Sequence, residues 1–164
     1  MSQYPISLYS EIAPNLFMGG TADEDVIQQA VPYNKARTDL PFDAIITMYA
    51  WANPADWKVQ EFRYGIYDSA ISEIDLDRLK QAVEFGYNRW LSGDRLLVRC
   101  QAGLNRSGLV TALIMMSTGL DAETAIEQIR TNRGDMALFN NNYVEWLMTK
   151  GASFLAPSSL QEIA

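Results

Sequence analysis

The residues with the clearest chemical potential lie in one short segment, residues 96–110, which reads LLVRCQAGLNRSGLV. It holds the only cysteine of the sequence, Cys100, and a nearby arginine, Arg106. A thiol beside a helix N-terminus and an arginine ionises readily and then acts as a nucleophile. The planar guanidinium of an arginine can bind two phosphate oxygens at once. The pair therefore favours transfer of a phosphoryl group to sulfur.

A strand, a loop and a helix are needed to position these two side chains. Residues 94–100 are predicted to form a buried strand and residues 107–118 a buried helix. Gly103 lets the loop curl, and Gly108 allows close packing in the first turn of the helix. Ligands bind where such strands end and such helices begin, with backbone N–H groups converging on an anion. The predicted phosphate-binding residues are Gln101, Ala102, Gly103, Leu104, Asn105 and Arg106.

The same segment has a purely structural interpretation. Cys100 would then be a small buried hydrophobic residue, Arg106 a surface charge and AGLNRSG an ordinary turn. We favour the functional interpretation because a buried strand, the glycines, an arginine, a serine and an apolar helix all coincide. An arginine alone at that position would arise by chance in roughly one sequence in sixteen.

Composition excludes several kinds of chemistry. The 164 residues contain no histidine and one cysteine, which excludes imidazole-based catalysis and leaves no ligand set for a zinc ion. The net charge is −7 and the 13 lysines and arginines are scattered, so we expect no nucleic-acid partner. A single thiol cannot form an internal disulfide and suits a reducing compartment. No apolar stretch is long enough to span a membrane, and the first residues, MSQYPISLYSEIAP, do not resemble a signal peptide. We therefore expect a cytoplasmic protein with no membrane partner.

The remaining pattern predicts an α/β fold. Strands are expected on both sides of Pro14, at 42–50 and at 61–67, and the last of them ends near Asp68. Helices are expected at 23–31 and at 72–91. Two further helices are expected, one that begins after Asp121 as its N-cap and one that begins at about residues 140–142. Strands alternate with helices early in the chain and helices dominate its last third. This favours one domain over 1–164, with a central, mostly parallel mixed sheet flanked by helices. The tail after Ala156 is expected to be loose.

The segment CQAGLNRS resembles the C-x-x-x-x-x-R-[ST] signature of the cysteine-based protein tyrosine phosphatases, and AGLNRSG is most similar to their dual-specificity branch. The segments EIAPNLFMGG, FDAIITM and IRTNRGD add moderate likeness, so the resemblance covers most of the chain. It implies that Cys100 forms a phosphocysteine and that Arg106 binds the phosphate and stabilises the transition state. It further implies that Ser107 donates a hydrogen bond to the sulfur, and that no metal or organic cofactor takes part.

The resemblance also implies an aspartate upstream that protonates the leaving oxygen and then activates water. Asp68 follows a predicted strand and precedes the long helix, and is our candidate. The plain alternative is that Asp68 only forms a turn with Ser69. Glu73 and Asp75 are rivals, but they lie at the helix start, where acidic residues favour the helix dipole.

One position departs from the family pattern. Family members carry a histidine immediately before the nucleophile, and this chain has Arg99. Arg99 could supply a permanent positive charge to the thiolate, or it could turn to solvent and leave the loop less ordered. We expect a working enzyme with an altered pH profile.

The resemblance implies a phosphatase that acts on phosphorylated proteins or peptides. It would hydrolyse phosphotyrosine, and phosphoserine or phosphothreonine as well. Trp51 and Trp57 could border the pocket or serve as core packing, and residues 140–142, all asparagine, could approach the site, although a helix cap is the simpler role. Two alternatives stay open. The chain could act on inositol phospholipids or RNA 5′ phosphates, as some relatives with similar signatures do. It could instead be a pseudophosphatase module that binds a phosphorylated partner without turnover. The oligomeric state is not encoded in any recognisable pattern.

Overall fold

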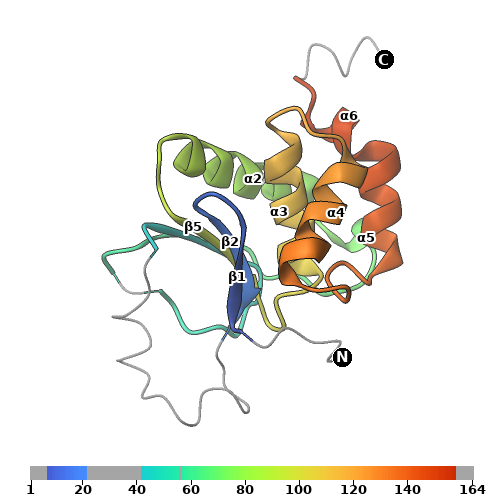
Figure 1. The fold of residues 1–164 in the computed structure, drawn as a ribbon. Helices are drawn as coiled ribbons and strands as arrows, with labels where there is room; N and C mark the ends of the chain where they lie inside the picture. Colours follow the sequence, from blue (N-terminus) through green and yellow to red (C-terminus); the bar gives the residue numbers. More distant parts are fainter. Residues whose placement is uncertain (1–6, 22–41, 56, 158–164) are drawn as a thin grey trace.

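The computed structural model describes residues 7–21, 42–55 and 57–157 (Figure 1). The helix expected at 23–31 and the tail beyond residue 157 lie outside the described residues. Among the described helices, none combines the length and the apolar character that crossing a membrane requires.

Five strands form one mixed, mostly parallel sheet in the order β1-β2-β5-β3-β4. β1 (Tyr9–Ala13) pairs antiparallel with β2 (Leu16–Gly20), and these are the strands predicted on either side of Pro14. β2 and β3 (Ala44–Thr47) both run parallel to β5 (Leu96–Cys100), and β4 (Gln60–Arg63) runs parallel to β3. β5 is thus the middle strand and is buried throughout, as its apolar run predicted.

The helices gather on one side of this sheet (Figure 1). They are α2 (Leu76–Leu91), α3 (Arg106–Met116), α4 (Ala122–Arg133), α5 (Asn141–Trp146) and α6 (Ala152–Leu155), with a 3-10 turn at Ile71–Glu73 before α2 and a π turn at Leu147–Gly151 between α5 and α6. Every residue of α3 from Ser107 to Met116 is buried, so α3 is the central helix of the core.

Two apolar clusters lie on opposite faces of the sheet because side chains alternate along a strand. The larger cluster includes Val98 and Cys100 of β5 together with α3. The smaller one contains Leu97 of β5, which packs with Phe17, Phe42 and Ile45. Neighbouring residues of β5 therefore face different surroundings, and this alternation decides the environment of Cys100.

Three predicted elements had boundaries that were wrong by several residues. The strand expected at 42–50 is shorter at both ends and covers only Ala44–Thr47. The strand expected at 61–67 ends at Arg63, because its partner β3 ends at Thr47 and the last regular pairing is Thr47 with Arg63. The helix expected from residue 72 begins at Leu76, because the carboxylate of Asp75 accepts hydrogen bonds from the first turn and caps it there. The Asp121 cap of α4 is confirmed: its side chain accepts from the backbone N–H of Thr124 at 2.8 Å.

Candidate active site

The predicted nucleophile and its serine lie together. Cys100 is the last residue of β5 and is buried, and Ser107 is in the first turn of α3. Their Sγ and Oγ atoms are 3.3 Å apart, within hydrogen-bond distance for sulfur. In the thiolate state the hydroxyl is the donor of this pair. The loop between β5 and α3, residues 101–105, begins at the thiol and ends at the helix N-terminus, as the sequence predicted.

The loop is held in a narrow shape by its glycine and by β2. Gly103 has φ +75°, and a Cβ there would overlap the backbone of Gly19 and Gly20. The backbone N–H of Thr21 donates to the carbonyl of Gln101 at 3.1 Å, so the end of β2 forms one wall of the loop. Only glycine combines this backbone conformation with this close approach.

Arg106 is the first residue of α3, and its guanidinium is only partly hydrogen-bonded. Its Nη1 donates to the carbonyl of Ile66 at 3.0 Å, and its guanidinium lies over the ring of Tyr49, 5.4 Å from the centroid. Its Nε is buried and has no hydrogen-bond partner among the described residues. A buried donor without a partner is costly, and an anion bound in the loop would satisfy it.

Asp68 is brought beside the loop although it comes from a distant segment. Its Oδ2 accepts from Nδ2 of Asn105, and its Oδ1 from Nδ2 of Asn140, each at 2.8 Å. The backbone N–H of Asn140 in turn donates to Oδ1 of Asn105 at 2.9 Å. These hydrogen bonds link Asp68, Asn105 and Asn140 in a closed set that orients the carboxylate beside the loop of residues 101–105. Asp68 itself is solvent-exposed, so it can meet a substrate.

The rivals of Asp68 have other contacts. Glu73 accepts a hydrogen bond from Ser69, and Asp75 accepts from the backbone N–H groups of Asp77 and Arg78 at 3.0 and 3.2 Å. Asn140 fills both roles considered for the asparagine run. Its Oδ1 accepts from the backbone N–H of Asn142 and caps α5, while its Nδ2 contacts Asp68.

A second arginine supports the loop from below and was missed by the sequence analysis. Arg133, the last residue of α4, is buried; its Nε donates to the carbonyl of Gly103 at 3.1 Å. Its two Nη atoms donate to the carbonyls of Ser7 and Leu8 at 2.9 and 3.1 Å. The motif IRTNRGD contains it, but an arginine before a helix-ending glycine is readily explained by the helix dipole alone.

Burial lowers the pKa of the Arg133 guanidinium to about 10, and the charge of Cys100 acts in the opposite direction. Arg133 therefore stays protonated at neutral pH. The attraction between Arg133 and the sulfur is mutual, so Arg133 supplies a positive charge on the side of the sheet that holds the thiol.

Arg99 takes neither of the two places expected for it. It is buried, and it lies on the opposite face of the sheet from Cys100, as strand alternation requires. Its Nε donates to Oγ1 of Thr47 at 3.0 Å, and its Nη2 forms an ion pair with Glu61 at 3.2 Å. Burial alone would raise the pKa of Glu61, but hydrogen bonds from Thr47 and Ala55 and the charges of Arg99 and Arg63 lower it overall.

Tyr143 of α5 is a buried polar residue behind the site. Its hydroxyl donates to the carbonyl of Tyr67 at 2.9 Å, which fixes the segment that carries Asp68. Burial, followed by the charge of Asp68, raises the pKa of the Tyr143 hydroxyl. The hydroxyl therefore stays neutral and keeps this hydrogen bond through the physiological pH range.

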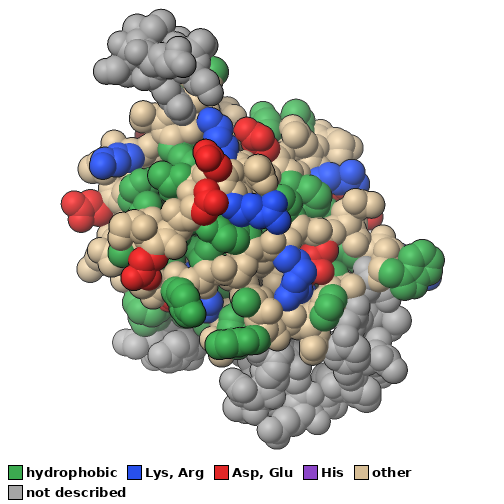
Figure 2. All heavy atoms as spheres, turned by 180° about the vertical axis from the view of Figure 1, so that it is seen from behind, with side chains coloured by type: hydrophobic (Ala, Val, Ile, Leu, Met, Phe, Trp, Pro, Cys, Tyr) green, Lys and Arg blue, Asp and Glu red, His purple; other side chains and the backbone are tan. Residues whose placement is uncertain are grey.

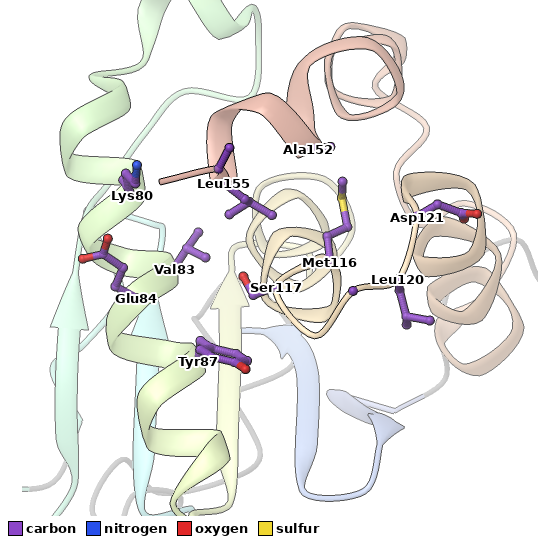
Figure 3. A pocket seen from close by; sticks show the side chains of 12 residues that line it. Lys80, Val83, Glu84, Tyr87, Met116, Ser117, Leu120, Asp121, Ala152 and Leu155 are labelled. Atoms are coloured by element: carbon purple, nitrogen blue, oxygen red, sulfur yellow. The ribbon is translucent and has the colours of Figure 1, made fainter. Parts of the chain in front are cut away.

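A cavity elsewhere in the described structure carries no comparable chemistry. A cavity of about 620 Å³ lies between α2, the C-terminal end of α3 and α6 (Figure 3), at the other end of α3 from the loop. Its lining includes Tyr87, Met116 and Leu155. Within the described ranges, no group of three or more cysteine, aspartate or glutamate side chains is placed to hold a metal ion.

Comparison with known proteins agrees with this geometry. Residues 29–153 match the family "Dual specificity phosphatase, catalytic domain". Human DUSP28 superposes with a TM-score of 0.72 at 19% identity, covering 98% of this chain and 99% of that one. The human tyrosine phosphatase-like serine/threonine/tyrosine-interacting protein superposes with a TM-score of 0.67 at 21% identity, covering 90% of this chain and 98% of that one. PTPMT1 in complex with PI(5)P superposes with a TM-score of 0.68 at 19% identity, covering 96% of this chain and 100% of that one. No curated protein sequence matches the chain significantly. The family match spans most of the sequence, and the chain belongs to the dual specificity phosphatase catalytic domain family.

Proposed function

We propose that this protein is a cysteine-dependent phosphatase that hydrolyses phosphotyrosine in proteins or peptides, and phosphoserine or phosphothreonine in addition. The observation that carries the proposal is the buried Nε of Arg106, which has no partner among the described residues and lies in the first turn of α3 beside Cys100. A donor in this place suits a phosphate whose phosphorus faces the sulfur.

In the first step the Cys100 thiolate attacks phosphorus, the S–P bond forms and the bond to the leaving oxygen breaks. Arg106 and the backbone N–H groups of the loop neutralise charge on the three non-bridging oxygens. Asp68 gives its proton to the leaving oxygen. Each oxygen of Asp68 accepts one amide hydrogen bond, from Asn105 or Asn140, which leaves a lone pair free to carry that proton.

In the second step water attacks the phosphocysteine. Asp68, now a carboxylate oriented by both amides, accepts the proton of the water, and the S–P bond breaks. Ser107 donates to the departing sulfur from 3.3 Å and lowers the energy of the thiolate that leaves. The cycle ends with inorganic phosphate and regenerated Cys100, and it requires no metal or organic cofactor.

The competing substrates fit the charge of the molecule less well. PTPMT1 was solved with the lipid PI(5)P, and lipid or RNA substrates call for a basic rim. This chain has a net charge of −7, and on the face seen in Figure 2 the Lys and Arg side chains are interspersed with Asp and Glu. A binding module without turnover would need the loop and Arg106 but not the pairing of Cys100 with Ser107.

The test is hydrolysis of p-nitrophenyl phosphate from pH 5 to 8, with chelator present. The native chain should be active, Cys100→Ser inactive, and Asp68→Asn reduced about 100-fold or more, in line with the loss of a general acid. A small effect of Asp68→Asn would transfer the acid role to Glu73 or Asp75. An inert native chain that still binds vanadate would make the protein a phosphate-binding module.

A further inference from the structure

The loop that follows β3, residues 49–55, places one aromatic ring against Arg106 and a second ring against the first. The ring of Tyr49 lies under the guanidinium of Arg106, with 5.4 Å from the Arg106 Cζ to the ring centroid. Trp51 meets Tyr49 edge to face, with centroids 6.0 Å apart and an interplanar angle of 82°. Trp51 is 80% exposed. We call residues 49–55 the rim loop.

The rim loop is fixed by hydrogen bonds on both sides of Trp51. Nη2 of Arg63 donates to the carbonyl of Ala52 at 2.7 Å and to that of Ala50 at 3.3 Å. The backbone N–H of Ala52 donates to the carbonyl of Tyr49 at 3.2 Å, which closes a turn around the tryptophan. These hydrogen bonds fix the backbone on both sides of Trp51, whose ring stays exposed apart from its edge contact with Tyr49.

A partly buried charge cluster of Glu61, Arg63 and Arg99 anchors the rest of the rim loop. Nη2 of Arg99 donates to the carbonyl of Asn53 at 2.7 Å, and Oε1 of Glu61 accepts from the backbone N–H of Ala55 at 3.0 Å. Oε2 of Glu61 joins the two arginines, at 3.1 Å from Arg63 and 3.2 Å from Arg99. The arginine that replaces the family histidine thus holds the rim loop in place, on the side of the sheet away from the thiol.

We infer that Tyr49 and Trp51 form a preorganised aromatic wall that binds the ring of an aromatic phosphate ester, with Trp51 as a specificity-determining residue. The inference rests on the proposed function, because it places the phosphate on Arg106. The ring of an aryl ester begins one oxygen atom from that phosphate. It would therefore meet Tyr49, which lies against Arg106, and then Trp51, which contacts Tyr49. Aromatic pairs add affinity beyond area burial, and a rigid wall loses little entropy on binding. An alkyl phosphate gains neither advantage.

The chain offers a matched control. Trp57 is 86% exposed and is thus similar to Trp51 in type and exposure, but its ring lies under the ammonium of Lys58, at 5.6 Å, rather than against Tyr49. Loss of general surface hydrophobicity should therefore be equal in Trp51→Ala and Trp57→Ala. A specific contact with the substrate ring is lost in Trp51→Ala alone.

The experiment measures the dissociation constants of phenyl phosphate and methyl phosphate by calorimetry, in a Cys100→Ser background that cannot form the phosphocysteine. The ratio of the two constants should favour phenyl phosphate, and Trp51→Ala should reduce this preference by about 3- to 10-fold, the range expected for one aromatic contact. Trp51→Phe should retain most of the preference and Trp57→Ala all of it. The affinity for methyl phosphate should be the same in all variants.

Equal binding of the two esters, or equal effects of Trp51→Ala and Trp57→Ala, would overturn the inference. A drop in affinity for both esters in Trp51→Ala would also overturn it, since the tryptophan would then act on the phosphate loop. An intact preference for phenyl phosphate in a native chain that hydrolyses nothing would support the aromatic wall and overturn only the phosphatase proposal.

Discussion

Arg133 and Arg99 are both buried arginines near the loop of residues 101–105. They differ in the charge of their hydrogen-bond acceptors. Arg133 donates to backbone carbonyls and to the hydroxyl of Ser10, all of them neutral. Arg99 forms an ion pair with the carboxylate of Glu61. The positive charge of Arg133 is therefore available to the thiol, while that of Arg99 is largely cancelled on the other face of the sheet.

The difference shows that the neighbour in sequence is not the electrostatic neighbour of Cys100. Strand alternation points Arg99 away from the thiol, whereas α4 brings Arg133 beneath the loop from far along the chain. The cation expected directly before the nucleophile thus organises the rim loop. The cation that faces the nucleophile comes from the end of a helix.

The largest effect is expected for Arg133→Met. Buried carbonyls that lose their donor each cost about 1–3 kcal/mol, so the free energy of unfolding should fall by at least about 2 kcal/mol in urea titrations. With both loop support and positive charge gone, kcat/KM for p-nitrophenyl phosphate should fall about 100-fold or more. Arg130→Met is the control, since Arg130 donates to the carbonyls of Ala137 and Leu138. Equal losses of activity in both variants would refute a specific role for Arg133.

A smaller effect is expected for Arg99→Met. It removes the hydrogen bonds to Thr47 and Asn53 and leaves Glu61 paired with Arg63 alone, which should cost about 1–3 kcal/mol of unfolding free energy. Because Arg99 faces away from Cys100, kcat/KM should fall less than about tenfold, and the pH profile of the remaining activity should keep its shape. A displaced pH profile would show that Arg99 acts on the thiol after all.

The smallest effect, and the one with the clearest pH signature, is expected for Glu61→Gln. The pKa of Glu61 is lower in the folded than in the unfolded protein. The charged carboxylate therefore stabilises the fold at a pH above the unfolded pKa. This stabilisation is lost as the pH falls through the folded pKa. Urea unfolding at pH 7 should show a loss of about 1–2 kcal/mol that shrinks below pH 4.5. Glu84→Gln, on the exposed face of α2, should show no such loss. A loss that does not depend on pH would mean that packing and not charge holds the cluster.

The sequence was most informative where local chemistry decides the structure. The apolar residues 96–98 predicted β5, and the glycine and arginine spacing predicted the loop and α3. Capping side chains located the starts of α4 and α5 near Asp121 and Asn140. These features depend on neighbours within a few residues. Asp68 lies beside Asn105, and its role as general acid stays a prediction.

Contacts between segments that are distant in the sequence could not be predicted in this way. The end of β4 depends on where β3 stops, and the acceptors of Arg99 and Arg133 come from strands and turns distant in sequence. Trp51 and Trp57 were ambiguous because an apolar side chain in a loop has no periodicity to show its direction. In the structure both are exposed, which excludes core packing for either.

The bridge made by Arg133 also bears on the order in which the molecule folds. Arg133 joins the phosphate loop to Ser7, a residue 126 positions earlier in the chain. Contacts between such distant segments form late, after helices and local turns, because closing a long loop costs entropy that few early contacts repay. A refolding chain should therefore recover its helical signal before it recovers the contacts between Arg133, Gly103 and Ser7. A nascent chain that still lacks α4 would contain Cys100 but not the support that Arg133 gives to the loop beside it. The thiol would therefore gain its folded surroundings only when the domain is complete.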